Sequence, residues 1–383
     1  MSINIDYCFV IGPVKSGTTL MVSLLDSHQD LSLFPMEVKF ITHWLERLSI
    51  KQPNYRELSD FFLNESKIKL MNVNSTEESD IMNSGRIDFT GFDYPSLVET
   101  MEANASRYDE AEISGSELFR QFMYDIHETL RNLCERHRFK VIVSKEGNHG
   151  SKHLEAICDI YPKSKFVVIV RDPRDIYVSF KTIAKKKKEG IRSPSFKDYV
   201  TPCKYIYDNK DKNIGAYQEI GINYEGADNY CFVKYENLVE DTRNEMKIVA
   251  RFLDLSYNDD LLVPTNLGNH WRGNASSLIS FEKVDSNRIG KWRDQLEASE
   301  RRIIEYFCYD YLKINGYDLP SNKPRAHRVL LDICVTEASG VHITHLTSIR
   351  GVYFLFRKVN VFVNAIYKCL VDSSLLDRLN RDS

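Results

Sequence analysis

The first residues that could do chemistry form a glycine-rich turn. Four residues lie between Gly12 and Gly17, and Thr18 and Thr19 follow directly. This spacing is that of a loop for the phosphates of ATP or GTP, in which a lysine comes directly after the second glycine. Thr18 holds that lysine position here, and the only cation in the turn is Lys15. The sequence therefore predicts an anion-binding turn in which the lysine that reaches the terminal phosphates of ATP is displaced.

The elements expected on either side of this turn suit anion binding. Residues 7–11 form an apolar run typical of a buried strand, and residues 18–27 carry leucine and methionine at helical spacing. A helix that begins at such a turn points backbone N–H groups and the positive end of its dipole at the anion. The alternative is a tight turn between strand and helix with Lys15 exposed to solvent.

Further short apolar runs alternate with helical spacing along the chain. Residues 140–144, 165–170 and 230–234 have the composition of buried strands. Strands that alternate with helices form right-handed βαβ units, so we predict an α/β fold. Its three layers are a central parallel sheet and helices on both faces. We interpret the mostly helical region 40–140 as an insertion on the substrate side.

Four chemically informative side chains come just after predicted strands: Lys15, Lys145, Arg171 and Tyr235. Ligands of parallel α/β sheets bind at the carboxyl ends of the strands. We therefore expect the four residues to converge on one edge of the sheet. For Tyr235 the alternative is a tyrosine that packs on the sheet where a helix begins.

A second candidate phosphate element follows the strand at 165–170. Arg171 lies at the strand end, and Ser179 lies on the second turn of the next predicted helix, so both can bind one phosphate. The forked donors of arginine suit a phosphate dianion. The alternative is a salt-bridged helix cap, in which Asp172 or Asp175 neutralises an arginine. Two phosphate elements indicate a ligand with phosphate groups at both ends of a nucleoside.

These segments resemble those of a known family. Residues 13–19 (PVKSGTT) resemble the phosphosulfate loop of sulfotransferases that use 3′-phosphoadenosine 5′-phosphosulfate (PAPS). Residues 170–179 (VRDPRDIYVS) are similar to their element for the 3′-phosphate. Three further segments agree in order, at 143–149, 233–238 and 286–293, and the last resembles the segment that closes over the nucleotide.

The resemblance implies that a sulfuryl group moves from PAPS to an acceptor hydroxyl by in-line attack, with PAP as product and without a metal. Lys15 would neutralise the bridging oxygen, while Lys145 and the threonines hold the sulfonate. The catalytic residues that it implies are Lys15, Glu37 and Lys145. The implied donor-binding residues are Lys15, Ser16, Gly17, Thr18, Thr19, Arg171, Ser179, Tyr235, Arg288, Gly290 and Lys291.

The general base is expected to be Glu37. It follows the first helix at the spacing where carbohydrate-type sulfotransferases carry a glutamate, whereas relatives that act on phenols and steroids use a histidine. A surface carboxylate paired with Lys39 is the alternative. Glu146 and His149 stay open as other bases, although the spacing of His149 differs from that of the histidine type. The acceptor is therefore predicted to be a small molecule or a glycan, with a carbohydrate or glycolipid hydroxyl favoured.

Two other functions compete with this prediction. A P-loop small-molecule kinase would need a lysine at position 18 and an acidic magnesium ligand after an apolar strand, and neither is found. A non-catalytic relative that binds a nucleotide or glycan would be expected to lack Lys15 or Arg171, and both are present.

The composition indicates which partners and which cellular compartment to expect for the protein. The net charge of −3 over 383 residues gives no general attraction to nucleic acid, so none is expected as a partner. The eight cysteines are scattered without a C-x-x-C pair, which indicates buried free thiols in a reducing compartment. No signal peptide and no bilayer-spanning run is recognised, so we predict a cytoplasmic protein.

The chain is expected to divide into a sulfotransferase domain, residues 1–320, and a helical tail, residues 321–383. Within the tail, residues 350–368 mix aromatic side chains with cations. Packing on the domain or on a second subunit, as in a homodimer, is the favoured prediction. The alternative is peripheral contact with a membrane surface, which would suit a lipid-linked acceptor.

Overall fold

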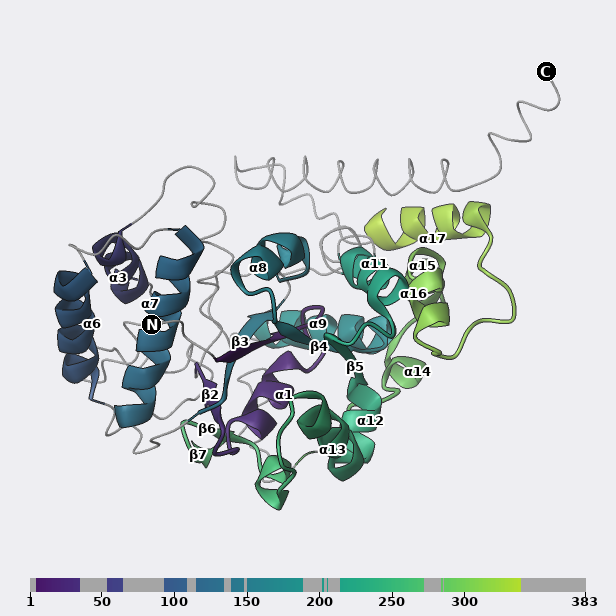
Figure 1. Cartoon of the computed structure of the whole chain (residues 1–383). Helices are drawn as coiled ribbons and strands as arrows, with labels where there is room; N and C mark the ends of the chain where they lie inside the picture. Colours follow the sequence, from purple (N-terminus) through teal and green to yellow (C-terminus); the bar gives the residue numbers. More distant parts are fainter. Residues whose placement is uncertain are drawn as a thin grey trace, which may run out of the picture. The chain divides into compact units, whose positions relative to one another are not determined.

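The computed structural model describes most of the chain, in two compact units (Figure 1). The described residues are 5–34, 54–64, 93–108, 115–133, 139–147, 150–188, 202, 205, 214–271, 284 and 286–338. The first unit, here the sheet unit, draws its residues from 1–12, 17–170 and 224–286. The second, here the helix unit, draws them from 13–16, 171–223 and 287–383.

The core of the sheet unit is a five-stranded parallel sheet with the order β2-β3-β1-β4-β5. Its strands are β1 (Asp6–Ile11), β2 (Leu31–Leu33), β3 (Val141–Gly147), β4 (Lys165–Val170) and β5 (Tyr230–Lys234). The apolar runs of β1 and β4 are buried because each strand is covered on both faces. The four predicted strands are thus confirmed, and β2, only three residues long, was not predicted.

Helices cover both faces of this sheet. Figure 1 shows α8 (Leu154–Ile160) above it, with α1 (Thr18–Leu25) and α13 (Thr242–Phe252) below it. The predicted three-layer α/β arrangement with a parallel sheet is therefore confirmed.

Helical spacing over residues 236–253 predicts one helix after β5, and the structure has two there, which corrects that prediction. They are α12 (Tyr235–Glu240) and α13, and Asp241 separates them. The Asp241 side chain accepts a hydrogen bond from the Asn244 N–H at 3.2 Å. An N-cap aspartate of this kind starts a new helix and ends the preceding one.

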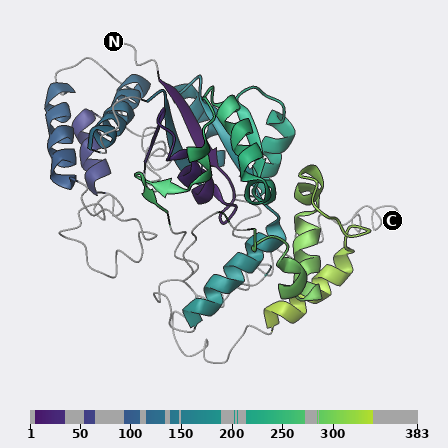
Figure 2. The same ribbon diagram turned by 90° about the horizontal axis from the view of Figure 1, so that it is seen from below.

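The described part of region 40–140 is helical, as predicted. It contains α3 (Tyr55–Asn64), α6 (Tyr94–Tyr108) and α7 (Gly115–Leu133), which lie together beside the sheet (Figure 2). Their interface holds the buried carboxylate of Asp125, which accepts hydrogen bonds from Tyr55 Oη and Gln121 Nε2, both at 2.7 Å. Burial raises the pKa of Asp125 to about 6.

The helix unit consists of α15 (Ala298–Phe307) and of helices that precede and follow it in the sequence. These are α9 (Pro173–Lys188), α11 (Gly215–Tyr224), α14 (Trp292–Gln295), α16 (Tyr309–Ile314) and α17 (Ala326–Ala338). Figure 2 shows α15, α16 and α17 packed together. Arg302 on α15 makes two hydrogen bonds to the Asp332 carboxylate on α17, at 2.7 and 2.8 Å.

α17, the helix near the start of the predicted tail, therefore packs against α15. The aromatic and cationic segment at 350–368 is outside the described residues, so its contacts stay a prediction. Within the described ranges, no helix combines the length and the apolar character that crossing a bilayer requires.

Candidate functional site

The predicted anion-binding turn connects β1 to α1. Lys15 and Gly17 both have left-handed backbone, with φ of 69° and 111°. This conformation is typical of turns whose N–H groups form anion-binding concavities. The chain passes from the helix unit to the sheet unit between Ser16 and Gly17, so each unit is described by its own contacts below.

In the sheet unit, Gly17 is required by the ring of Tyr235. A Cβ placed on Gly17 would lie 2.5 Å from Tyr235 Cδ2, which is closer than packed atoms can approach. Tyr235 is the first residue of α12 and is buried. The Tyr235 ring therefore packs on the turn between β1 and α1, and its expected role in donor binding stays a prediction.

Lys145 and Thr19 meet in the same unit. The Lys145 ammonium donates a hydrogen bond to Thr19 Oγ1 at 2.9 Å. Lys145 lies inside β3, which continues to Gly147, and this corrects the prediction that Lys145 comes after the strand. The ladder between β1 and β3 shifts register between Val10 and Ile11, and pairing extends the strand past Lys145. Lys145 still lies next to the carboxyl end of β3, where it reaches the first turn of α1.

Of the three candidate general bases, Glu146 is the one that lies among the described residues. The Glu146 side chain is buried, and its Oε1 accepts a hydrogen bond from Ser144 Oγ at 3.3 Å. Glu37 and His149 lie outside the described residues, as does Lys39.

In the helix unit, Arg171 joins two backbone segments. Its Nη1 donates to the Lys15 carbonyl at 2.9 Å, and its Nη2 donates to the Arg288 carbonyl at 3.1 Å. Arg171 directly follows β4 in the chain and is buried, with its own N–H 3.3 Å from Tyr311 Oη. One guanidinium thus holds the backbones of two segments that lie far apart in the sequence.

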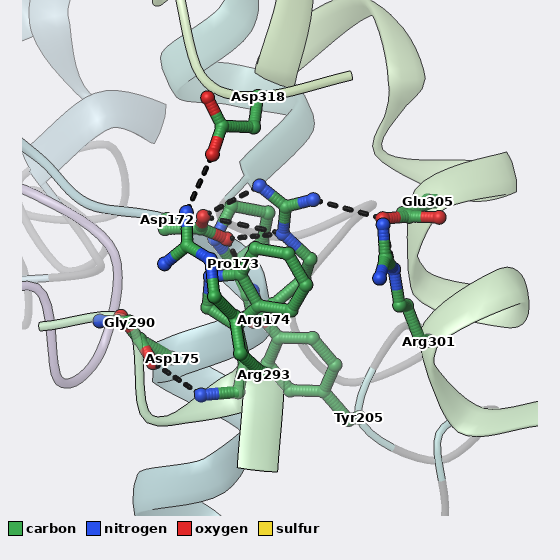
Figure 3. A network of polar contacts seen from close by, with 11 residues as sticks. Asp172, Pro173, Arg174, Asp175, Tyr205, Gly290, Arg293, Arg301, Glu305 and Asp318 are labelled. Carbon is green, nitrogen blue, oxygen red and sulfur yellow. Dashed lines mark hydrogen bonds and ion pairs between the residues drawn. The ribbon is translucent and has the colours of Figure 1, made fainter. Parts of the chain in front are cut away.

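The salt-bridged cap considered as an alternative is present, and its arginine is Arg174 (Figure 3). Two guanidinium nitrogens of Arg174 bind Asp172, and Nη1 donates to Glu305 Oε1 at 2.8 Å. The guanidinium also lies over the Trp292 ring, 3.8 Å from its centroid. Because Arg174 takes this role, Arg171 is available for backbone carbonyls rather than for the cap.

Asp175 lies in the first turn of α9, and Ser179 lies in the second. The Asp175 carboxylate accepts hydrogen bonds from the N–H groups of Gly290 and Trp292, and Ser179 Oγ donates to the Asp175 carbonyl at 3.1 Å. Burial raises the pKa of Asp175. Lys291 lies between the two donating residues and is exposed.

The predicted residues therefore form one group in each unit. In the sheet unit they are Gly17, Thr18, Thr19, Lys145 and Tyr235; in the helix unit they are Lys15, Ser16, Arg171, Ser179, Arg288, Gly290 and Lys291. Sequence reasoning missed Glu305, which lies 131 residues from Arg174, and the acceptor role of Asp175 toward Gly290. No local sequence signal points to either contact.

Comparison with known proteins identifies the family of this chain. Residues 8–259 match the model of the sulfotransferase family. Protein-tyrosine sulfotransferase 1 of Danio rerio is 23% identical over 328 residues, 84% of this chain and 74% of that protein. The protein-tyrosine sulfotransferase of Drosophila melanogaster is 22% identical over 329 residues, 82% of this chain and 52% of that protein.

Two solved structures are also similar. The sulfotransferase domain from the curacin biosynthetic pathway has a TM-score of 0.48 and 19% identity, covering 83% of this chain and 100% of that one. Retinol dehydratase in complex with androsterone and the inactive cofactor PAP has a TM-score of 0.35 and 15% identity, covering 82% of each chain. Because the family model spans more than half of the residues, from β1 to the end of α13 and beyond, this chain belongs to the sulfotransferase family.

Proposed function

We propose that this sulfotransferase takes its sulfuryl group from PAPS and releases PAP. The observation that carries the proposal is the Arg171 guanidinium, which is hydrogen-bonded to the carbonyls of Lys15 and Arg288. These bonds bring the backbones of two further cationic residues to Arg171, and cationic side chains are the partners that a phosphate dianion requires. Ser179 and Lys291 are proposed as further ligands of the 3′-phosphate.

The sulfonate end of the donor is assigned to the turn residues and to Lys145. The hydrogen bond from Lys145 to Thr19 holds the ammonium at the first turn of α1. We assign Lys15 to the bridging oxygen, where negative charge develops as the bond to sulfur breaks. Donors directed at developing charge contribute about 3–4 kcal/mol each to the transition state.

The reaction is an in-line displacement at sulfur. The acceptor oxygen forms a bond to sulfur, the bond from sulfur to the bridging oxygen breaks, and PAP leaves with that electron pair. The acceptor proton passes to a base, which we propose is Glu37. Glu37→Gln is then expected to lose turnover and to keep PAP binding. Near-normal turnover of this variant would show that Glu37 is not the base.

The acceptor that we propose is a hydroxyl of a carbohydrate or glycolipid. The support is the position of Glu37 in the sequence, since a sugar hydroxyl is a weak acid and depends strongly on a base. The names of the two relatives supply a second candidate, the phenolic hydroxyl of a protein tyrosine. A phenol has a pKa near 10 and depends less on the base.

The test uses the full-length protein, radiolabelled PAPS and two sets of acceptors, glycans with glycolipids and tyrosine-containing peptides. We expect label in the first set. Label only in the peptides would overturn the carbohydrate acceptor and keep the donor. Lys15→Met is expected to stop transfer, and the matched control Lys163→Met, which changes an exposed lysine between α8 and β4, is expected to retain it. Failure of the wild-type protein to bind PAP would overturn the donor itself.

A further inference from the structure

We propose that Asp175 is a positioning residue for the 3′-phosphate of the donor. In this role it holds the turn at residues 290–292, and with it Arg288, in place beside Arg171. The inference rests on the proposed donor and adds to it a residue that has no place in the donor-binding set above. Asp175 is assigned no contact with the donor itself.

The first observation is the use of both carboxylate oxygens. Oδ2 accepts from the Gly290 N–H at 2.7 Å, and Oδ1 accepts from the Trp292 N–H at 2.9 Å (Figure 3 shows the first bond). The Asp175 side chain is 2% exposed. Gly290 has a φ of 69°, a left-handed conformation that glycine adopts without strain. The turn thus directs two backbone N–H groups toward the same place. The Asp175 carboxylate lies there and accepts both hydrogen bonds.

The second observation is that the same segment is attached at another point. Arg171 Nη2 donates to the Arg288 carbonyl, two residues before Gly290. Arg171 directly follows β4, and Asp175 lies in the first turn of α9. One short stretch of chain therefore holds the 288–292 segment through a donor, Arg171, and an acceptor, Asp175. Loss of the acceptor is expected to release the turn and to move the Arg288 carbonyl away from Arg171.

The third observation is that a carboxylate is specifically suited to this position. Both N–H groups need an acceptor, and asparagine supplies one oxygen and an NH₂ group that is itself a donor. Burial raises the pKa of Asp175, whereas the hydrogen bonds from the Trp292 and Gly290 N–H groups act to lower it. Asp175→Asn therefore keeps the shape and leaves one buried N–H facing a donor.

The Trp292 side chain is held independently of Asp175. Its ring lies on Arg174, whose guanidinium is fixed by Asp172 and Glu305. Glu305→Gln is therefore a matched control, because it changes a buried carboxylate of the same unit that accepts no backbone N–H of residues 290–292 in the described contacts.

The experiment compares two nucleotides, PAP and 5′-AMP, which lacks the 3′-phosphate. The full-length protein and its variants are titrated with each by calorimetry. In the wild-type protein we expect a ratio of affinities that strongly favours PAP. Asp175→Asn is expected to lower this ratio by about tenfold or more, mostly by weakening PAP. Glu305→Gln is expected to lower thermal stability and leave the ratio unchanged, since general destabilisation weakens both nucleotides equally.

The outcomes separate the inference from the proposed donor. A wild-type protein that binds PAP and 5′-AMP equally would contradict the donor. A wild-type preference for PAP that persists in Asp175→Asn would overturn the inference and keep the donor. If Asp175→Asn does not fold, Gly290→Ala makes the same test, because alanine disfavours a φ of 69° and moves the N–H from Asp175. An unchanged ratio in Gly290→Ala would then overturn the inference.

Discussion

The ring of Tyr235 lies against Gly17 so closely that a Cβ at position 17 would come within 2.5 Å of Tyr235 Cδ2. Gly17 also has a φ of 111°, which side chains other than glycine rarely adopt. The turn between β1 and α1 is therefore shaped by a tyrosine more than 200 residues away in the sequence. This relationship leads to the first prediction.

Gly17→Ala is expected to lower the free energy of unfolding by about 3 kcal/mol or more, since backbone strain and an atomic overlap add together. Urea unfolding measures the change. Gly226→Ala is the matched control, because Gly226 has a φ of 82° with no atom within 4 Å of an added Cβ. The control is expected to lose only the backbone part, about 1–2 kcal/mol. Equal losses in the two variants would show that the ring contact is unimportant.

Lys145 and Thr19 are expected to act as a unit in turnover. In a double-mutant cycle with Lys145→Met and Thr19→Val, we expect the losses in kcat/KM to fall short of additivity by about 1–2 kcal/mol, as for a hydrogen bond to a charged group. Ser27→Ala serves as the control partner, because Ser27 Oγ donates to the Asp260 carbonyl instead. Additive losses for Lys145 and Thr19 would contradict the coupling.

Asp125 is expected to make stability depend on pH. Its pKa rises from 3.8 to about 6 on folding, so the folded state binds more protons than the unfolded state between these values. The contribution of Asp125 to stability is therefore present below about pH 4 and is lost as the pH rises through 6. Asp125→Asn removes this loss. Relative to wild type, the variant is expected to gain up to about 3 kcal/mol between pH 4 and pH 7 in urea unfolding. A pH-independent difference would contradict the assignment.

Ser16 is expected to matter for the donor and not for folding. Its side chain is fully buried, and among the described residues its hydroxyl has no hydrogen-bond partner. Removal of such a group leaves stability unchanged or higher. Ser16→Ala should therefore keep the melting temperature and weaken PAP binding.

The matched control for Ser16 is Ser32→Ala. Ser32 Oγ lies 2.9 Å from Nδ1 of the buried His127, whose pKa burial lowers to about 3. Loss of this partner is expected to cost about 1–3 kcal/mol, because it leaves a buried ring nitrogen without its hydrogen bond. If Ser16→Ala destabilises the protein as much as Ser32→Ala does, the Ser16 hydroxyl has a structural role.

The parts of the fold that depend on local sequence could be predicted. The apolar runs of β1 and β4 need burial on both faces, and that need alone identifies a parallel sheet. β2 has only three residues, which is too short for a pattern, and its place beside β3 depends on pairing. Asp241 could have been recognised as an N-cap, but the helical spacing continues across it.

In the candidate site, too, some features could be predicted from the local sequence and others could not. The residue types at positions 15, 171 and 288 could be read as phosphate ligands, since their chemistry is local. Their contacts could not, because Arg171 meets Lys15 across 156 residues and Arg288 across 117. The partners of Arg174 and Asp175 lie 131 and 115 residues away. Such pairs are decided by packing of the whole unit, for which a single sequence holds no signal.

The link from Lys15 through Arg171 to Arg288 also has a consequence for biosynthesis. A ribosome makes Lys15 long before Arg171 and Arg288, so the three segments can come together only after more than 270 further residues have been added. Contacts of such high sequence separation form late in folding. Nascent chains arrested before residue 288 are therefore expected to carry a folded β-sheet core without the ability to retain PAP.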